Sequence, residues 1–485
     1  MQIYNTLTGE KEPFIPRVEK KINMYVCGIT PYDKSHLGHA RTLVSFDVIR
    51  RYLIFKKFEV RYVQNVTDID DKIIKRAKEK NMPPLELSEK YNALSEREFD
   101  MLGIMRPDFS PKVSLYISSI IELIRKIEQN GFAYKTDSGV YFDVLKFEKY
   151  GKLSGQTPDT IKAGARIEVD EKKKNPQDFA LWKFGEEAGV TFESPWGRGR
   201  PGWHIECSAM ATKLLGNTLD IHGGARDLIF PHHENEIAQS ETATQHPFVR
   251  HWVHTGFLTV NGEKIAKSLG NFITIEDGLK KFTPQQIRML FIMSHYRSPM
   301  DFSEEAVVAA GNALASLHSS ISTAKTYSSP ANMDGGLEAE AEKTEKEFFA
   351  AMDDDFDTPR AMACLFALGK KISGACSDGT TSQTSVKKAA DTMEKLLSIF
   401  NIAPAARKET SEEKGRITKL CEEFGVEVSK SEQNMIEGLI TVRNEAREKK
   451  DFAVSDTIRN GLSEAGIILE DRKDGTVGWH RKTTA

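Results

Sequence analysis

The sequence lacks an apolar run approaching the roughly 20 residues that a helix needs to span a bilayer. Its first residues, Met1-Gln2-Ile3-Tyr4-Asn5-Thr6, do not have the pattern of a secretory signal peptide. Cysteine is also scarce, with five in 485 residues, an odd number without a close-spaced framework. These absences argue against a membrane protein and a disulfide-stapled secreted domain, so we expect a cytoplasmic protein in a reducing compartment.

The sequence also has no large excess of positive or negative charge, since its formal net charge is −3 at pH 7. A polyanionic partner would therefore have to meet locally clustered Lys and Arg. The candidate basic segments, each of which alone is better explained as a solvated helix or loop face, are Arg50-Arg51, Lys56-Lys57, Lys162 to Lys174 and Arg443 to Lys450. With 39% hydrophobic and 28% charged residues, the composition is that of an ordinary globular protein long enough for several domains.

A strand, a loop, a helix and a second strand are predicted near the start of the chain. An apolar run over 22–26 precedes CGITPYDKSHLGH, an amphipathic helix is expected over 37–55, and a second extended run covers 60–66. This order is typical of the βαβ unit of a parallel sheet, in which ligands bind beyond the carboxyl ends of the strands. The prediction places His36 and His39 at that edge, at the start of the helix.

A second motif, Lys264-Ile265-Ala266-Lys267-Ser268, lies far downstream. Two lysines and a hydroxyl suit a polyphosphate. Each motif is weak alone, because HLGH could be a helix cap and the lysine pair a solvated face. Together, and in this order, they resemble the HIGH and KMSKS signatures of class I aminoacyl-tRNA synthetases, although Ala266 removes one hydroxyl from the second signature.

A third group of residues offers metal ligands. Cys27 follows the first expected strand, and Cys207 ends the segment WHIEC. Interpreted as a helix start, FPHHENE places His232 and Glu236 four residues apart on one face. Two thiolates, an imidazole and a carboxylate make a possible four-ligand zinc set. The spacing is not that of a compact zinc finger, so buried core cysteines and a surface His/Glu pair remain the alternative.

Longer segments closely resemble the cysteinyl-tRNA synthetase family over nearly the whole chain. These segments are IYNTLTGEKEPF, MYVCGITPYDKSHLGHART, NVTDIDDKII, GRPGWHIECSAM, DIHGG and FPHHENEIAQS. The resemblance implies one zinc ion per chain, held by Cys27, Cys207, His232 and Glu236, which binds the thiol of the substrate cysteine. Serine offers a far poorer ligand, so such a site would select cysteine without an editing domain.

The resemblance also implies the reaction and its residues. A cysteine–tRNA ligase joins cysteine to ATP with Mg²⁺, forming cysteinyl-adenylate, and transfers cysteine to the terminal adenosine of tRNA(Cys). His36, His39 and Lys267 are implied as catalytic. The implied ATP contacts are His36, Gly38, His39, Lys264, Lys267, Ser268 and Asp227, and the implied cysteine contacts are Thr67, Trp203 and His222. From the residues alone, Trp203 would be a packing aromatic and Asp227 a surface charge. We expect a monomer.

The expected fold is α/β, with a Rossmann-like parallel-sheet catalytic domain that carries a connective insertion, followed by a helical bundle and a small C-terminal α/β domain. The expected units are the catalytic domain (1–110 and 200–260), the insertion (111–199), the lysine loop and stem-contact region (261–305), the bundle (306–402) and an anticodon-binding domain (414–485). Within the insertion we expect a helix over 114–130 and a hairpin around 135–139, and within the bundle a break after Ser328.

Two other functions remain open. One is a ligase that forms the same adenylate but passes cysteine to a small amine, such as an amino sugar. Relatives of that kind are shorter, and the segment Arg443 to Trp479 argues against this function. The other is a non-catalytic, zinc-dependent RNA-binding relative. Such a protein would be expected to have lost Lys267 or one of His36 and His39, whereas this chain has all three.

Overall fold

The computed structural model describes residues 1–156, 173–186, 189–260, 262–264, 272–404, 411–429, 431–471 and 477–481. The chain forms two compact units. Unit 1 comprises Met1–Ala310 and Phe349–Ala361, and unit 2 comprises Gly311–Phe348 and Met362–Ala485. Among the described residues, no helix combines the length and the apolar character needed to cross a membrane.

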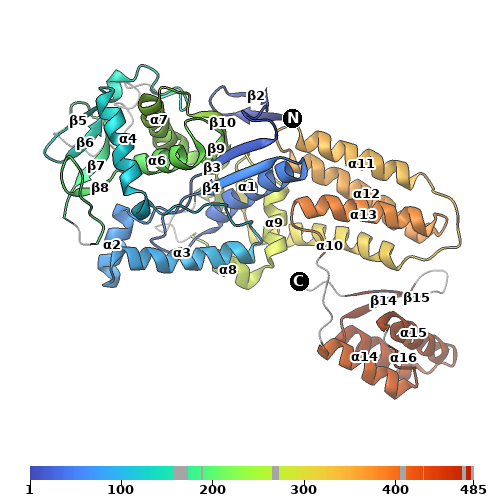
Figure 1. Ribbon diagram of the computed structural model, residues 1–485. Coiled ribbons are helices and arrows are strands. Elements are labelled where there is room, and N and C mark those ends of the chain that lie inside the picture. Colours follow the sequence, from blue (N-terminus) through green and yellow to red (C-terminus); the bar gives the residue numbers. More distant parts are fainter. Residues whose placement is uncertain are drawn as a thin grey trace. The chain divides into compact units, whose positions relative to one another are not determined.

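Unit 1 contains a four-stranded parallel sheet with the strand order β10-β9-β3-β4 (Figure 1). Its strands are β3 (Lys21–Val26), β4 (Glu59–Gln64), β9 (Leu219–Ala225) and β10 (Val249–Thr255). The interior strand β3 buries Ile22, Met24, Tyr25 and Val26. Such a nearly continuous apolar run is typical of a parallel strand that is covered on both faces.

Helix α1 (Leu37–Phe55) connects β3 to β4, which confirms the predicted helix and the βαβ unit. Asp47 on this helix accepts hydrogen bonds from Arg288 of α9 (Pro284–Ile292) at 2.6 Å and from the backbone N–H of Met105 at 2.9 Å. Both charged side chains are buried. This ion pair ties α1, whose first residues carry the predicted histidine motif, to α9.

The segment between β4 and β9 forms a separate antiparallel sheet with the order β5-β6-β7-β8. It confirms the predicted helix and hairpin, which are α4 and the β5–β6 pair. Its elements are α2 (Asp71–Lys80), α3 (Pro84–Met101), η1 (Val113–Leu115), α4 (Ile117–Gln129), β5 (Ala133–Lys135), β6 (Gly139–Phe142), η2 (Val144–Lys146), β7 (Phe179–Phe184), β8 (Gly199–Pro201) and α6 (Trp203–Leu215).

One apolar core joins this second sheet to the helices that flank the first. It includes Ile124 of α4, Trp182 of β7, Met210 of α6 and Ile237 of α7 (Glu234–Thr244). Because α6 and α7 belong to this core, the segments that carry Cys207 and Glu236 are held by both sheets.

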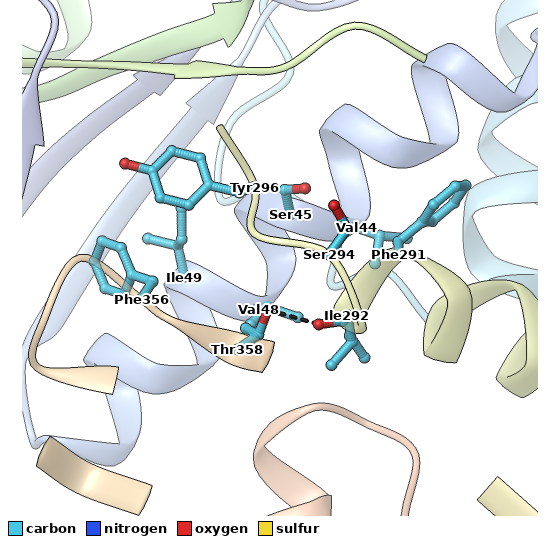
Figure 2. A pocket seen from close by; sticks show the side chains of 10 residues that line it. All are labelled: Val44, Ser45, Val48, Ile49, Phe291, Ile292, Ser294, Tyr296, Phe356 and Thr358. Atoms are coloured by element: carbon cyan, nitrogen blue, oxygen red, sulfur yellow. Dashed lines mark hydrogen bonds between the residues drawn. The ribbon is translucent and has the colours of Figure 1, made fainter. Parts of the chain in front are cut away.

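The other elements of unit 1 flank these sheets. They are β1 (Gln2–Asn5), β2 (Glu10–Pro13), η3 (Arg226–Leu228), η4 (Ile229–His233), β11 (Leu258–Val260), β12 (Glu263–Lys264), α8 (Ile275–Lys281) and β13 (Met300–Phe302). Figure 2 shows a small cavity beside α1, lined by Val48 and Ile49, where Thr358 donates a hydrogen bond to the carbonyl of Ile292. Its volume of about 20 Å³ matches one water molecule, which is too small for an amino acid or a nucleotide.

Unit 2 is mainly helical, as predicted. Helices α10 (Glu304–Thr326), α11 (Leu337–Met352) and α12 (Thr358–Asp378) each have residues assigned to both units, and α13 (Gln383–Ile399) lies wholly in unit 2. The predicted break after Ser328 is present, because α10 ends at Thr326 and α11 begins at Leu337.

The final part of unit 2 has its own apolar core, which includes Cys421, Leu439, Ile458 and Ile467. Its elements are α14 (Ser411–Phe424), α15 (Glu432–Glu448), α16 (Phe452–Glu464) and the antiparallel pair β14 (Ile467–Asp471) and β15 (Val477–Arg481). This confirms the predicted small C-terminal assembly of α and β elements.

Candidate functional site

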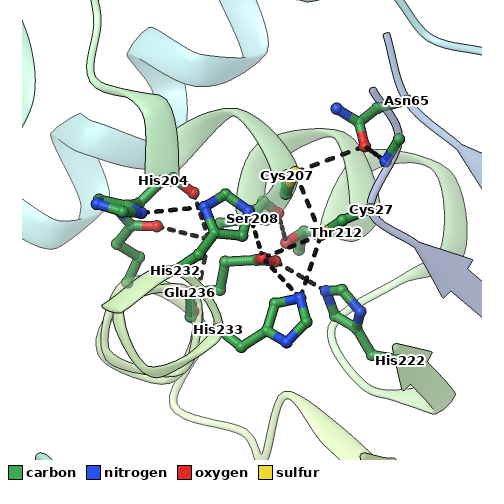
Figure 3. A network of polar contacts seen from close by, with 12 residues as sticks. Cys27, Asn65, His204, Cys207, Ser208, Thr212, His222, His232, His233 and Glu236 are labelled. Atoms are coloured by element: carbon green, nitrogen blue, oxygen red, sulfur yellow. Dashed lines mark hydrogen bonds and ion pairs between the residues drawn. The ribbon is translucent and has the colours of Figure 1, made fainter. Parts of the chain in front are cut away.

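The structure brings Cys27, Cys207, His232 and Glu236 together at the carboxyl edge of the parallel sheet (Figure 3). Cys27 directly follows β3, Cys207 lies in α6, His232 in η4 and Glu236 in the first turn of α7. Their ligand atoms all lie within 4.8 Å of one another, and all four side chains are nearly or fully buried. This group could hold a metal ion.

The distances within this cluster are short. The Cys27 Sγ lies 3.8 Å from the Cys207 Sγ and 3.6 Å from the Glu236 Oε1, and the His232 Nε2 lies 3.0 Å from that same oxygen. The prediction that FPHHENE opens a helix is only partly right. His232 lies in the wider turn η4 before α7, yet its side chain still meets that of Glu236 four residues later.

Charge within the cluster is unevenly distributed. The hydrogen bond with Cys27 lowers the pKa of Cys207 to about 6, whereas burial raises the pKa of Cys27 well above its usual range. Burial opposes ionisation of Glu236, but His222 and His232 hold its pKa at about 2. Burial also opposes protonation of His232, but Glu236 and Cys207 raise its pKa to about 10. An ionised carboxylate beside a readily ionised thiol is the donor chemistry of a cation site.

Two histidines hold the cluster from outside. The Nδ1 of His204 lies 3.0 Å from the Nδ1 of His232, so the Nε2 of His232 is the nitrogen directed at the cluster. The Nε2 of His222 lies 2.9 Å from the Oε2 of Glu236. Partners of this kind orient metal ligands. The structure thus places His222, predicted to contact cysteine, directly against a predicted metal ligand.

A second group of potential ligands overlaps the first and comprises Cys27, His222, His233 and Glu236. The His233 Nε2 lies 3.3 Å from the Cys27 Sγ, and its Nδ1 lies 2.7 Å from the Nε2 of His254. Sequence reasoning missed His204, His233 and His254. The available signal was a histidine within an otherwise apolar strand, as in WVHT, which is unusual for a core position.

The predicted nucleotide motif lies at the start of α1. His36 caps the helix, its Nδ1 accepting from the Gly38 N–H at 3.1 Å, and the His39 Nδ1 accepts from the His36 N–H at 3.3 Å. The two rings stack with centroids 3.7 Å apart. Burial lowers the pKa of His39, and His36 and Lys72 lower it further. A neutral imidazole that accepts through Nδ1 carries its proton on Nε2, so both rings can donate to an anion at this helix N-terminus.

The other predicted contact residues lie in different settings. Thr67 is buried just beyond β4, and its Oγ1 accepts from the Asn65 Nδ2 at 3.1 Å. Trp203 begins α6 with 39% of its surface exposed, its ring 4.3 Å from that of His232. Asp227 is exposed in η3, just beyond the carboxyl end of β9. Trp203 therefore borders the cluster of potential ligands directly, and Thr67 is connected to it through Asn65, whose Oδ1 lies 3.6 Å from the Cys207 Sγ.

Of the predicted lysine motif, only part lies within the described residues. Lys264 closes β12, whose backbone pairs with β11. Lys267 and Ser268 lie outside the described residues.

Comparisons with known proteins agree with these features. The family model described as "tRNA synthetases class I (C) catalytic domain" matches residues 13–312, and a "DALR domain" model matches residues 347–403. A cysteine–tRNA ligase from Desulforamulus reducens is 45% identical, covering 99% of this chain and 100% of the relative. One from Thermococcus onnurineus is 44% identical, covering 99% of each chain.

Solved structures show the same fold at low sequence identity. The methionyl-tRNA synthetase of Mycobacterium tuberculosis with methionyl-adenylate has a TM-score of 0.60 and 16% identity, covering 79% of this chain and 90% of its own. A putative arginyl-tRNA synthetase from Campylobacter jejuni has a TM-score of 0.55 and 12% identity, covering 79% and 93%. The class I catalytic-domain match and the full-length relatives show that this chain belongs to the cysteine–tRNA ligase family of class I aminoacyl-tRNA synthetases.

Proposed function

We propose that the chain activates cysteine with ATP and Mg²⁺ to cysteinyl-adenylate and transfers the cysteine to tRNA(Cys), with one zinc ion selecting the substrate thiol. The buried Cys27/Cys207/His232/Glu236 cluster carries this proposal. It lies at the same sheet edge as the histidine-capped start of α1. An amino acid held at the cluster could therefore have its carboxylate near a nucleotide at α1.

The spacing of the cluster fits a tetrahedral zinc ion. With a Zn–S bond of about 2.3 Å, two sulfurs of a tetrahedron lie about 3.8 Å apart. The two thiols are 3.8 Å apart. For a sulfur and a carboxylate oxygen the expected separation is about 3.5 Å, close to the 3.6 Å between Cys27 and Glu236. Two sulfur donors also favour this group over the overlapping set with His222 and His233, because zinc binds thiolate strongly. Zinc bound here would supply a soft centre that prefers a substrate thiolate to the hydroxyl of serine.

The activation step needs positioning and charge neutralisation more than a protein nucleophile. A carboxylate oxygen of cysteine forms a bond to the α-phosphorus of ATP, and the bond to pyrophosphate breaks. His36 and His39 would donate hydrogen bonds from their Nε2–H groups to the phosphate oxygens at the N-terminus of α1. Gly38, Asp227, Lys264, Lys267 and Ser268 would complete the nucleotide site. Thr67 and Trp203 would border the bound cysteine, with His222 behind Glu236.

Transfer to tRNA would use parts of the chain remote from this site. We assign residues 111–199 to the acceptor end of the tRNA, residues 261–305 to the lysine loop and stem contact, and residues 414–485 to the anticodon. Residues 1–110 with 200–260 form the catalytic domain in this assignment, and 306–402 the bundle. The separate apolar core around Leu439 and Ile458 supports an independent role for the last segment.

Cysteine-dependent exchange of pyrophosphate into ATP, followed by charging of purified tRNA, tests the proposal. We expect both activities. Exchange without charging, combined with transfer of cysteine to a small amine, would indicate the amino-sugar type of ligase. Zinc and RNA binding without exchange would indicate a non-catalytic relative.

The zinc assignment has its own test. Cys207→Ser should lower the zinc content from about one per chain and abolish cysteine activation. Cys364→Ser, which changes a thiol of α12 outside the cluster, should retain zinc and activity. Metal-edge X-ray absorption should show two sulfur neighbours in the resting protein and three with cysteine added. A sulfur count that does not rise would make the metal structural and contradict thiol selection.

A further inference from the structure

Asn65 directly follows β4, and its side chain lies beside Cys207 at the edge of the predicted metal cluster (Figure 3). Its side chain is 2% exposed, so its polar atoms depend on protein partners. The Oδ1 accepts from the backbone N–H of Gly28 at 2.9 Å and lies 3.6 Å from the Cys207 Sγ. The Nδ2 donates to the Thr67 Oγ1 at 3.1 Å. One amide thus links its own segment, through Thr67, to the segments that carry Gly28 and Cys207.

The orientation of this amide is determined by its neighbours. A backbone N–H can only donate, so the atom that faces Gly28 must be the amide oxygen, and the NH₂ group must then face Thr67. The backbones of Gly28 and Asn65 are in close contact, because a Cβ at Gly28 would lie 1.6 Å from the backbone carbonyl oxygen of Asn65. A glycine beside Cys27 allows the two strand ends to approach this closely.

The bond to Thr67 has a consequence for the pocket. Because Oγ1 accepts from Asn65, the single hydroxyl proton of Thr67 is directed away from Asn65, on the side where Thr67 hydrogen-bonds the buried carboxyl of Glu206. Thr67 is also held through its backbone, whose N–H donates to the carbonyl of Ile29 at 3.1 Å. Asn65 therefore determines which way a buried hydroxyl can donate, on a segment whose position is already set by main-chain bonds.

We propose that Asn65 is a positioning residue for amino-acid binding: its amide fixes the Thr67 hydroxyl relative to the Cys27/Cys207 pair, and thereby sets how the substrate pocket meets the metal cluster. This inference rests on the proposed function, because it concerns the same site. Asn65 acts through Thr67 and Gly28, and it contacts no reacting atom.

The test compares Asn65→Ala with the wild-type protein in cysteine-dependent pyrophosphate exchange. We expect the KM for cysteine to rise about tenfold, equivalent to about 1.4 kcal/mol, which is the size expected when buried hydrogen bonds to one amide are removed. The KM for ATP and the zinc content should stay unchanged. The control is Asn92→Ala, because Asn92 is also buried but donates to Glu96 at 3.0 Å on α3, and it should behave as wild type.

A double-mutant cycle separates this role from a general structural one. Thr67→Val removes the hydroxyl at nearly constant size. If Asn65 acts through that hydroxyl, the KM for cysteine of Asn65→Ala/Thr67→Val should be no higher than that of the single variant with the higher KM. Additive effects of the two substitutions, or loss of zinc from Asn65→Ala, would overturn the proposal.

Two further outcomes are informative. If Asn65→Ala does not fold, Asn65→Ser carries the same test, and a wild-type KM for cysteine in a folded Asn65→Ser would also overturn the proposal. A wild-type protein without cysteine-dependent exchange would refute the proposed function. An active wild type whose Asn65 variants match it would refute only the role of Asn65.

Discussion

Substitution of Asp47 by alanine should destabilise unit 1 strongly. The carboxylate accepts from Arg288 Nη2 at 2.6 Å, from Arg51 Nε at 2.8 Å and from the Met105 N–H at 2.9 Å. Arg288 is 1% exposed, and burial lowers its pKa while Asp47 opposes that change. Removing one member of a buried ion pair costs about 3–5 kcal/mol, because the other charge is left without compensation.

Urea unfolding followed by tryptophan fluorescence measures this loss. Unit 1 holds four of the five tryptophans, namely Trp182, Trp196, Trp203 and Trp252, so a Trp479→Phe background reports on that unit alone. With a urea dependence of about 3 kcal/mol per molar, the midpoint should fall by about 1–1.7 M.

Two comparisons decide whether the ion pair is the cause. Arg51→Ala leaves the pair of Asp47 and Arg288 intact and removes a partner that is 22% exposed, so it should cost about 1 kcal/mol. The double variant Asp47→Ala/Arg288→Met should be more stable than Asp47→Ala, because it removes the uncompensated charge. A double variant as unstable as the sum of the two single variants would refute this reasoning.

Three further expectations concern function and dynamics. Lys267→Ala should slow adenylate formation about 10²–10³-fold with little change in cysteine binding, and unchanged exchange kinetics would make Lys267 only a surface residue. Removal of residues 414–485 should spare cysteine-dependent exchange but weaken tRNA binding and charging, whereas full charging by the shortened chain would contradict the anticodon assignment. Glu234→Ala removes the carboxylate that accepts from the N–H groups of Gly151, Leu153 and Ser154 at 2.9, 3.1 and 2.8 Å. Amide hydrogen exchange in residues 151–154 should therefore accelerate at least about tenfold. Unchanged protection would show that other contacts hold this loop.

Local patterns were sufficient to predict much of the fold. The apolar run before CGITPYDKSHLGH and the amphipathic segment after it predicted β3 and α1, because strand and helix periodicity are properties of neighbouring residues. The side chains around the cluster could not be found in this way. His233 and His254 come from different elements, and only tertiary packing brings their rings together.

The metal ligands illustrate the same limit. Spacing alone could not separate the set with Cys207 and His232 from the overlapping set with His222 and His233, because both share Cys27 and Glu236. Resemblance to a family selected the first set, and its role as the zinc site stays a prediction. The structure adds the distances that make a tetrahedral arrangement possible.

The wide separation of the ligands along the chain has a consequence for synthesis. Cys27 and Glu236 lie 209 residues apart. At a ribosomal rate of about 5–20 residues per second, Cys27 emerges about 10–40 s before Glu236 is made. A metal ion that needs all four of these residues could therefore not template the first steps of folding, and the nascent chain carries the Cys27 thiol without its partners throughout that interval. Under oxidative stress, the Cys27 thiol would be oxidised in newly made chains before it is oxidised in finished ones, because it is buried in the finished protein.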